Sequence, residues 1–226
     1  MSIIKNYLKA TPLIKAVTST YLSPEQFLQL YKAATDEERR ILLRHVVRFN
    51  TPYVFRDKPL LYEYIRQYLA DILQLEVQDV LLIGSAKTGF SMSTDQYGKA
   101  FSSKSDLDFT IVSKPLFDIL CNEYHTWHEL YTNGQEKPSI AEQNYWDANI
   151  NTLERTIDRR FIDTTKLPNR MCCPTNMMIN NAMYLIKTKL ELPFQITISH
   201  ASVRVYNDIN AFYRQLRINT NRLLPE

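Results

Sequence analysis

The chain has 226 residues, of which 45% are hydrophobic and 23% are charged, and these ordinary globular proportions exclude an intrinsically disordered chain. The formal net charge is only +3, so charge permits nucleotide or nucleic-acid partners without requiring them. The length suffices for one large domain or for a compact domain with a helical extension.

Localisation signals in the sequence are those of a cytoplasmic protein. No stretch approaches the roughly 20 apolar residues that span a bilayer, so we expect no membrane partner. Residues 1–6 lack the basic-then-apolar order of a secretory signal. Cys172 and Cys173 are adjacent, which is a strained geometry for a disulfide, so we expect the thiols to be reduced.

Residues 1–75 are predicted to form a helical N-terminal part. Ser23 and Thr35 each lie three residues before a Gln or Glu, a spacing that is typical of a capping box at the start of a helix. A third helix is predicted over residues 60–73, where apolar side chains keep a helical period. We interpret these apolar stripes as core.

A glycine-containing turn follows the first predicted strand, residues 80–83. Gly84 and Ser85 offer a sharp exit at which backbone amides and a hydroxyl can approach phosphate oxygens. Three of the chain's four glycines lie between this strand and the next, as expected of a backbone that approaches a ligand closely. Lys87 and Ser91 are predicted to add a positive charge and a hydroxyl beside the same phosphates.

Two carboxylates are predicted on one face of the next strand, residues 105–112. Leu107 and its apolar neighbours at alternate positions share one face, so Asp106 and Asp108 point together to the other. Carboxylates held this close repel each other unless a cation lies between them, and oxygen ligands favour Mg²⁺ or Mn²⁺ over Zn²⁺. The pattern predicts metal-dependent phosphoryl-transfer chemistry.

The second half alternates helices with short strands, which favours an α+β fold with a small mixed sheet packed by helices. Residues 132–138 carry the clearest loop signal, and Pro193 is expected to end the helix before the last strands. Helices are predicted at 116–131, 140–161, 174–190 and 208–224, and strands at 194–199 and 203–206.

These motifs resemble the DNA polymerase β-like nucleotidyltransferase superfamily, whose marks are a strand ending in Gly-Ser and a later strand with Asp-x-Asp. The resemblance covers residues 78–118 well and residues 203–213 weakly. The wider motif pattern is similar to small bacterial members of the superfamily found among antiphage defence genes. The residues that carry it are Gly84, Ser85, Gly89, Ser91, Gly98, Ser105, Asp106, Leu107, Asp108, Leu116 and Phe117.

The resemblance implies a polymerase β-like sheet in a core of residues 76–226, joined to the helical part as one compact unit. It implies transfer of NMP or dNMP from an NTP or dNTP to a hydroxyl acceptor, with release of pyrophosphate. Asp106 and Asp108 would be catalytic and would hold Mg²⁺ or Mn²⁺. An oligonucleotide or second messenger would be the product or acceptor, acting on an effector protein in antiviral defence.

The sequence departs from that family in its third carboxylate, which usually lies on a later strand. Neither of the last predicted strands contains an acid. Asp163, Glu191 and Asp208 are the candidates near strand ends, with Asp208 favoured by its position after residues 203–206. Two alternatives stay open: a catalytically degenerate module that binds a nucleotide or a partner, and a toxin-like nucleotidyltransferase that acts on protein or tRNA.

Three other groups of residues admit a functional interpretation beside a structural one. Cys121, His125 and His128 share one helical face and are of the types that bind Zn²⁺, although a fourth ligand is lacking. Ser199 and His200 lack the glycine-flanked elbow of a nucleophilic serine, although His200 is near the expected site. Side chains around the last strand could stack on a base; they are Arg204, Tyr206, Tyr213 and Arg214.

Overall fold

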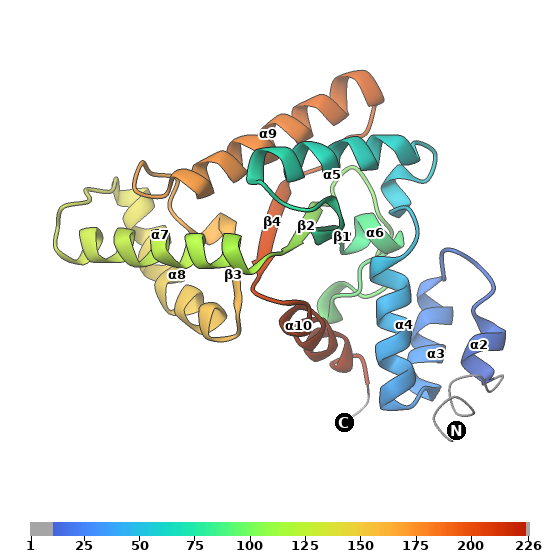
Figure 1. Cartoon of the computed structure of the whole chain (residues 1–226). Helices are drawn as coiled ribbons and strands as arrows, with labels where there is room; N and C mark the ends of the chain where they lie inside the picture. The colour runs from blue at the N-terminus through green and yellow to red at the C-terminus, as the bar shows by residue number, and fades with distance from the viewer. Residues whose placement is uncertain (1–10, 225–226) are drawn as a thin grey trace.

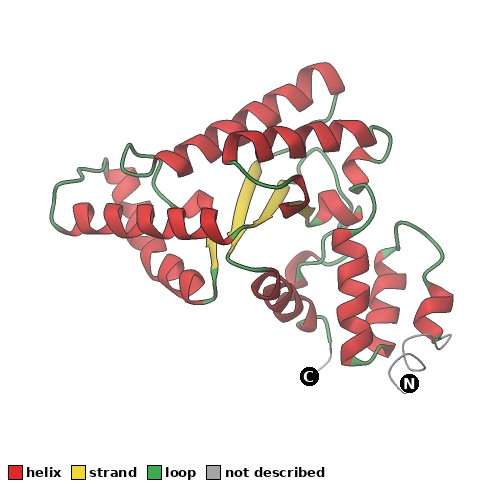
Figure 2. Ribbon diagram, viewed as in Figure 1, coloured by secondary structure: helices red, strands yellow, loops and turns green. Residues whose placement is uncertain are grey.

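A computed structural model describes residues 11–224, and in that range the chain is α+β, with four strands at the centre and nine helices around them (Figures 1 and 2). The predicted fold class, a small mixed sheet packed by helices, is confirmed at this level. The strands are β1 (Val80–Ile83), β2 (Leu107–Val112), β3 (Phe161–Asp163) and β4 (Ala201–Tyr206).

The helices occupy most of the positions predicted for them, and the Ser23 and Thr35 capping boxes are both present. Residues 1–10 of the predicted helical part, including those examined for a secretory signal, lie outside the described range. The helices are α2 (Pro12–Ala16), α3 (Pro24–Ala33), α4 (Asp36–Arg48), α5 (Pro59–Leu73), α6 (Ser85–Thr88), α7 (Lys114–Thr132), α8 (Ile140–Asp158), α9 (Pro174–Phe194) and α10 (Ile209–Asn221).

The sheet has the order β1-β2-β4-β3 and mixes both strand directions. β2 runs parallel to β4, whereas the outer strands β1 and β3 run antiparallel to their neighbours. Asp108 lies opposite Ile83 of β1 on one side and opposite Ser202 of β4 on the other. This register brings the end of β1, the start of β2 and the start of β4 together at one end of the strands.

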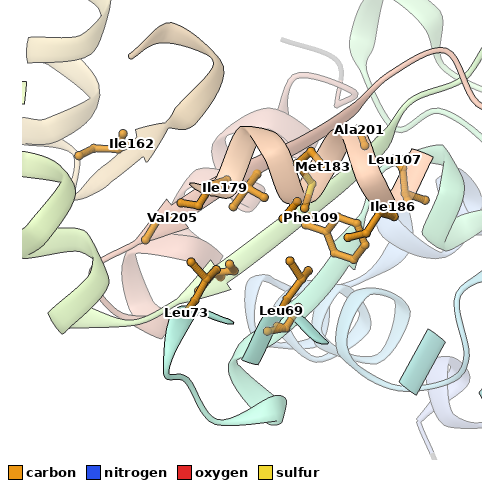
Figure 3. Packing of buried hydrophobic residues seen from close by; sticks show 14 of the residues in the cluster. Leu69, Leu73, Leu107, Phe109, Ile162, Ile179, Met183, Ile186, Ala201 and Val205 are labelled. Carbon is orange, nitrogen blue, oxygen red and sulfur yellow. The ribbon is translucent and has the colours of Figure 1, made fainter. Parts of the chain in front are cut away.

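One face of the sheet is buried under α5, α7 and α9. Phe109 and its alternate neighbours on β2 point into this layer and are fully buried. Apolar residues of all four strands enter the same cluster, so the face provides the main core. Figure 3 shows part of it: Leu69, Leu73, Leu107, Phe109, Ile162, Ile179, Met183, Ile186, Ala201 and Val205.

The opposite face is apolar at one end and polar at the other. At the apolar end, Tyr206 and Phe161 stack with ring centroids 5.1 Å apart and pack against Phe212 of α10. Val47 of α4 joins the same cluster. At the polar end, Asp108 and the neighbouring polar residues of β4 are only partly buried.

Three sequence predictions in the second half of the chain are wrong. Residues 194–199 are not a strand, because their alternating apolar side chains pack onto the main core instead of joining a ladder, with Ile198 only 3% exposed. Pro193 does not end α9 before it, because it lies in the last turn, and the helix continues to Phe194. The helix predicted to reach residue 161 ends at Asp158, and β3 follows it.

A second cluster joins the N-terminal helices to the segment after β1. Phe27 and Tyr31 of α3 pack with Leu42 of α4 and with Phe90. The Tyr97 hydroxyl donates a hydrogen bond to the Pro24 carbonyl at 2.6 Å. The N-terminal helices thereby support the loop between β1 and β2. Within residues 11–224 no helix has both the length and the apolar character needed to cross a membrane.

Glu123 of α7 caps the N-terminus of α9, whose own N-cap residue, Cys173, provides no side-chain hydrogen bond. The Glu123 carboxylate accepts hydrogen bonds from the Thr175 amide at 2.7 Å and the Asn176 amide at 3.1 Å. Both amides belong to the first turn, where a helix has no internal acceptors. α7 and α9 are therefore fixed to each other on the main core.

We expect Glu123→Ala to lower the free energy of unfolding by about 1 to 3 kcal/mol, because two buried amides lose their acceptor. The free energy of unfolding of Glu123→Gln, which keeps one acceptor oxygen, should lie between the values of Glu123→Ala and wild type. Urea denaturation followed by circular dichroism measures the change. Glu129→Ala removes an exposed acid from the same helix and is the matched control; equal stability of the two alanine variants would contradict the capping role.

Candidate functional site

A cavity of about 530 Å³ opens at the polar end of the sheet. It is walled by the turn after β1, by the loop that leads to β2, by the start of β2, by β4 and by α10. Of the predicted site residues, Gly84, Ser85, Ser91, Asp106 and Asp108 line this cavity. Sequence positions more than 20 residues apart therefore come together in one concave site.

Gly84 has a backbone conformation that other residues avoid. Its φ is 69° and its ψ is −160°, in a region that is essentially restricted to glycine. A Cβ at this position would lie 3.1 Å from the Asp108 Oδ2 atom. The turn and the carboxylate are thus in direct contact, and a side chain at position 84 would push them apart.

The loop between the turn and β2 is an ordered hairpin-like segment. Ser91 and Lys99 are joined by a backbone hydrogen bond of 2.8 Å, and the Gly98 amide donates to the Ser91 carbonyl at 3.0 Å. The Ser91 hydroxyl accepts from the Ser93 amide at 3.2 Å. These bonds hold the loop as one wall of the cavity, with Lys99 and Lys104 on its lining.

Asp106 and Asp108 flank the first residue of β2. Asp106 is exposed and immediately precedes the strand, while Asp108 is partly buried and accepts a hydrogen bond from the Ser202 hydroxyl at 2.9 Å. The strand start is fixed because the Leu107 amide donates to the His200 carbonyl at 2.8 Å. Both carboxylates line the cavity, as the period of two predicts.

The pKa of the Asp108 carboxyl is raised above its usual range. Burial is the largest cause, and the neighbouring charges of Asp106 and Asp163 raise it further. The Ser202 hydrogen bond and the Arg204 guanidinium oppose the shift without cancelling it. A second positive charge beside Asp108 would favour its ionised form, which is the electrostatic condition for binding a cation.

Arg204 of β4, for which the sequence indicated only a stacking role, lines the cavity. Its guanidinium donates to the Asp163 carboxylate of β3 at 3.1 Å. Asp163 also accepts from the Thr165 hydroxyl at 2.7 Å. The signal in the sequence was the alternation of Ser202 and Arg204 with buried valines, but the register that places them beside Asp108 is a tertiary property.

The structure separates the three candidates for a third carboxylate. Asp163 is on the polar face of the sheet, one strand beyond β4. Asp208, which the sequence favours, lies after the far end of β4, caps α10 and pairs with Arg160 at 3.2 Å. Glu191 is exposed on α9, which packs on the opposite face. The preference for Asp208 is wrong because β2 and β4 are parallel.

Lys87 is the one predicted site residue that does not line the cavity. Its side chain is only 4% exposed, and its ammonium donates to the Phe49 carbonyl at 2.7 Å and to the Asn50 carbonyl. Burial, followed by the Arg66 charge, lowers the pKa of Lys87 to about 8. Lys87 therefore ties α6 to the end of α4 instead of facing a ligand.

The remaining candidate groups have structural roles. His128 stacks on Tyr124 with ring centroids 5.6 Å apart. Burial raises the pKa of Cys121 to about 11, which disfavours the thiolate that a metal needs. His200 contributes its carbonyl to the β2 start but is not on the cavity lining. Tyr206 is buried between Phe161 and α10 and cannot stack on a base.

The donor set of the cavity fits Mg²⁺ or Mn²⁺. Mg²⁺ in nucleotide sites commonly takes one or two carboxylates and completes its shell with water and phosphate oxygens. Asp106 and Asp108 supply that number, and Asp108 carries a carboxyl that an added cation would stabilise. Among residues 11–224 no cluster of three or more Asp, Glu, His or Cys forms a preassembled metal site.

Comparisons with protein-family models, with curated protein sequences and with solved structures found no match to this chain.

We expect Lys87→Met to lower the free energy of unfolding by about 1 to 3 kcal/mol, because two carbonyls lose their donor. Phosphate-ligand binding by the folded protein should stay unchanged. Thermal melting and calorimetric titration with a nucleoside triphosphate measure the two effects. Lys99→Met, on the cavity lining, should behave in the opposite way, with unchanged melting and weaker binding; the reverse pattern would return Lys87 to the site.

Proposed function

We propose that the chain is a metal-dependent nucleotidyltransferase of the polymerase β-like superfamily. The observation that carries the proposal is the contact between the Gly84 turn and the Asp108 carboxylate at the wall of a 530 Å³ cavity. A phosphate-binding turn and a carboxylate pair must adjoin for this chemistry, because Asp106 and Asp108 would hold the metal beside the bound phosphates, where it would stabilise developing negative charge. The position of Asp108 near the start of β2, a central strand of the mixed sheet, supports the same proposal.

Each lining residue receives a role from its position. Ser85, Ser91 and the backbone beside Gly84 bind the triphosphate, and Lys99 and Lys104 offset its negative charge. Asp106 and Asp108 hold Mg²⁺ or Mn²⁺, which when bound would stabilise charge on the attacking and leaving oxygens. The acceptor oxygen bonds to the α-phosphorus as the bond to pyrophosphate breaks, and the hydroxyl proton passes to water or to a basic group.

A binding module without turnover is the second candidate, and Arg204 favours it. A guanidinium, instead of a carboxylate, lies on the strand beside Asp108, and Asp163 is engaged by Arg204 and Thr165. Activation of the acceptor by a third carboxylate would require Asp163 to release these partners. Incubation with each labelled NTP and dNTP plus Mg²⁺, followed by product separation, distinguishes the two: binding without any product would support the module.

The acceptor is part of the proposal at a coarser level. An oligonucleotide or a second messenger in antiviral defence is the product suggested by the defence-associated resemblance. A protein or tRNA acceptor would make the chain a toxin-like enzyme instead. Adding oligonucleotide, bulk tRNA or total protein separately to the labelled-nucleotide reaction identifies which of them acquires the label.

We expect Asp106→Asn and Asp108→Asn each to lower turnover by about a hundredfold or more, because losing a metal ligand removes several kcal/mol of transition-state stabilisation. Asp108→Asn should melt no lower than wild type, since burial already disfavours the charge that it removes. Asp95→Asn, an exposed acid on the same lining, is the matched control. Full activity of both site variants would refute the catalytic assignment.

We expect Gly84→Ala to abolish nucleotide use, because the new methyl group would displace the Asp108 carboxylate. Gly134→Ala is a control with the same φ of 69° and nothing within 4 Å of its Cβ. Gly84→Ala also carries backbone strain of about 1 to 3 kcal/mol, because its φ and ψ lie in a region that is essentially restricted to glycine, so thermal melting of both variants accompanies the binding measurement. Nucleotide titration with Mg²⁺ present separates strain from contact, and equal affinity of the two variants would place the nucleotide elsewhere.

A further inference from the structure

A second cavity, of about 420 Å³, lies between α4 and α10. Arg40, Arg44 and Arg48 of α4 and Arg217 of α10 line it. It is separate from the candidate catalytic cavity, although the same two helices contribute to both linings. Nothing in the proposed chemistry uses these four arginines, so the cavity needs its own explanation.

The arginines concentrate positive charge that Glu37 in the lining and the nearby Asp79 balance only in part. The four arginines and Glu37 give the described lining a formal excess of three positive charges, which equals the net charge of +3 of the entire chain. Within residues 11–224, Arg44, Arg48 and Arg217 take part in none of the salt bridges. A polyanion in the cavity would supply the missing counter-charges.

The spacing on α4 adds a cost that such a ligand would relieve. Arg40, Arg44 and Arg48 follow each other at intervals of four, so their side chains lie on one face of the helix. Like charges at this spacing destabilise a helix. All three side chains are exposed, so their guanidinium groups are available to a ligand. Guanidinium groups bind phosphate oxygens in a bidentate geometry, as they bind carboxylates.

Apolar and aromatic side chains lie beside the arginines. Tyr213 and Ile209 of α10 and Ile41 of α4 also line the cavity. An aromatic ring next to cationic groups is the combination that binds bases and phosphates of a single strand together. A volume of 420 Å³ is within the range of about 300 to 1,000 Å³ typical of small-ligand pockets, so single nucleotide units fit and a duplex does not.

We propose that this arginine cavity binds single-stranded oligonucleotide, with backbone phosphates on Arg40, Arg44, Arg48 and Arg217 and a base against Tyr213. The inference stands apart from the proposed transferase activity, because it concerns binding at a different cavity. If the chain does extend an oligonucleotide, the strand would be held on α4 and α10, which also wall the catalytic cavity.

The test is fluorescence anisotropy of the full chain with a short fluorescein-labelled oligouridylate, without Mg²⁺ or NTP, over a series of salt concentrations. We expect the double variant Arg44→Ala with Arg217→Ala to bind about tenfold more weakly or worse and to lower the salt slope by on the order of 1.4, since each phosphate contact contributes about 0.7. The double variant Arg44→Lys with Arg217→Lys should keep the slope.

The matched control is Arg155→Ala with Arg159→Ala, which removes the same charge from exposed positions at the end of α8. Unchanged binding in this control, with loss in the cavity variant, supports the proposal. Equal loss in both would show non-specific attraction and overturn it, as would retained binding in the cavity variant. Competition by inorganic pyrophosphate as strong as that by unlabelled oligouridylate would overturn the assignment to a strand.

Asp106→Asn separates this inference from the proposed function. It should bind the labelled strand as wild type does, because its carboxylate lies on the other cavity. Turnover without strand binding would refute the arginine cavity alone. Strand binding without turnover would refute the transferase alone.

Discussion

The contact between Gly84 and the Asp108 carboxylate is the constraint on which the candidate site depends. The antiparallel register sets Ile83 opposite Asp108, so the residue after β1 must approach the acid strand. Glycine suits this position because its φ of 69° and ψ of −160° are essentially restricted to glycine, and because a Cβ would lie only 3.1 Å from the Asp108 Oδ2 atom. The main core beneath Phe109 fixes this register, and burial of one face thereby positions the chemistry on the other.

The charges around Asp108 bear on whether the candidate site is catalytic. Asp108 is held between the negative charges of Asp106 and Asp163 and the positive charge of Arg204. The ion pair with Asp163 holds the Arg204 guanidinium on the polar face of the sheet in the absence of a ligand. Under the proposed function, the engaged Asp163 is the residue whose release from Arg204 and Thr165 would distinguish catalysis from simple binding.

The α4 and α10 helices connect the two cavities of this face. Val47 and Leu216 face the candidate catalytic cavity, and the adjacent residues Arg48 and Arg217 face the arginine cavity. One pair of helices thus presents different side chains to two ligand-sized spaces. A strand bound at the arginines would lie against the helices that also wall the site beside Asp108, which gives the basic residues a structural relation to the proposed chemistry.

The sequence by itself determined the features that depend on local spacing. Strand alternation placed Asp106 and Asp108 on one face, and the capping boxes identified two helix starts. The turn at Gly84 was recognisable because the adjacent residues Gly84 and Ser85 directly follow an apolar strand. Only the tertiary structure decided which distant groups meet. Lys87 donates hydrogen bonds to carbonyls after the end of α4, and Asp208 lies at the far end of the sheet. Strand order, strand direction and burial come from packing between segments distant along the chain, which local periodicity does not encode.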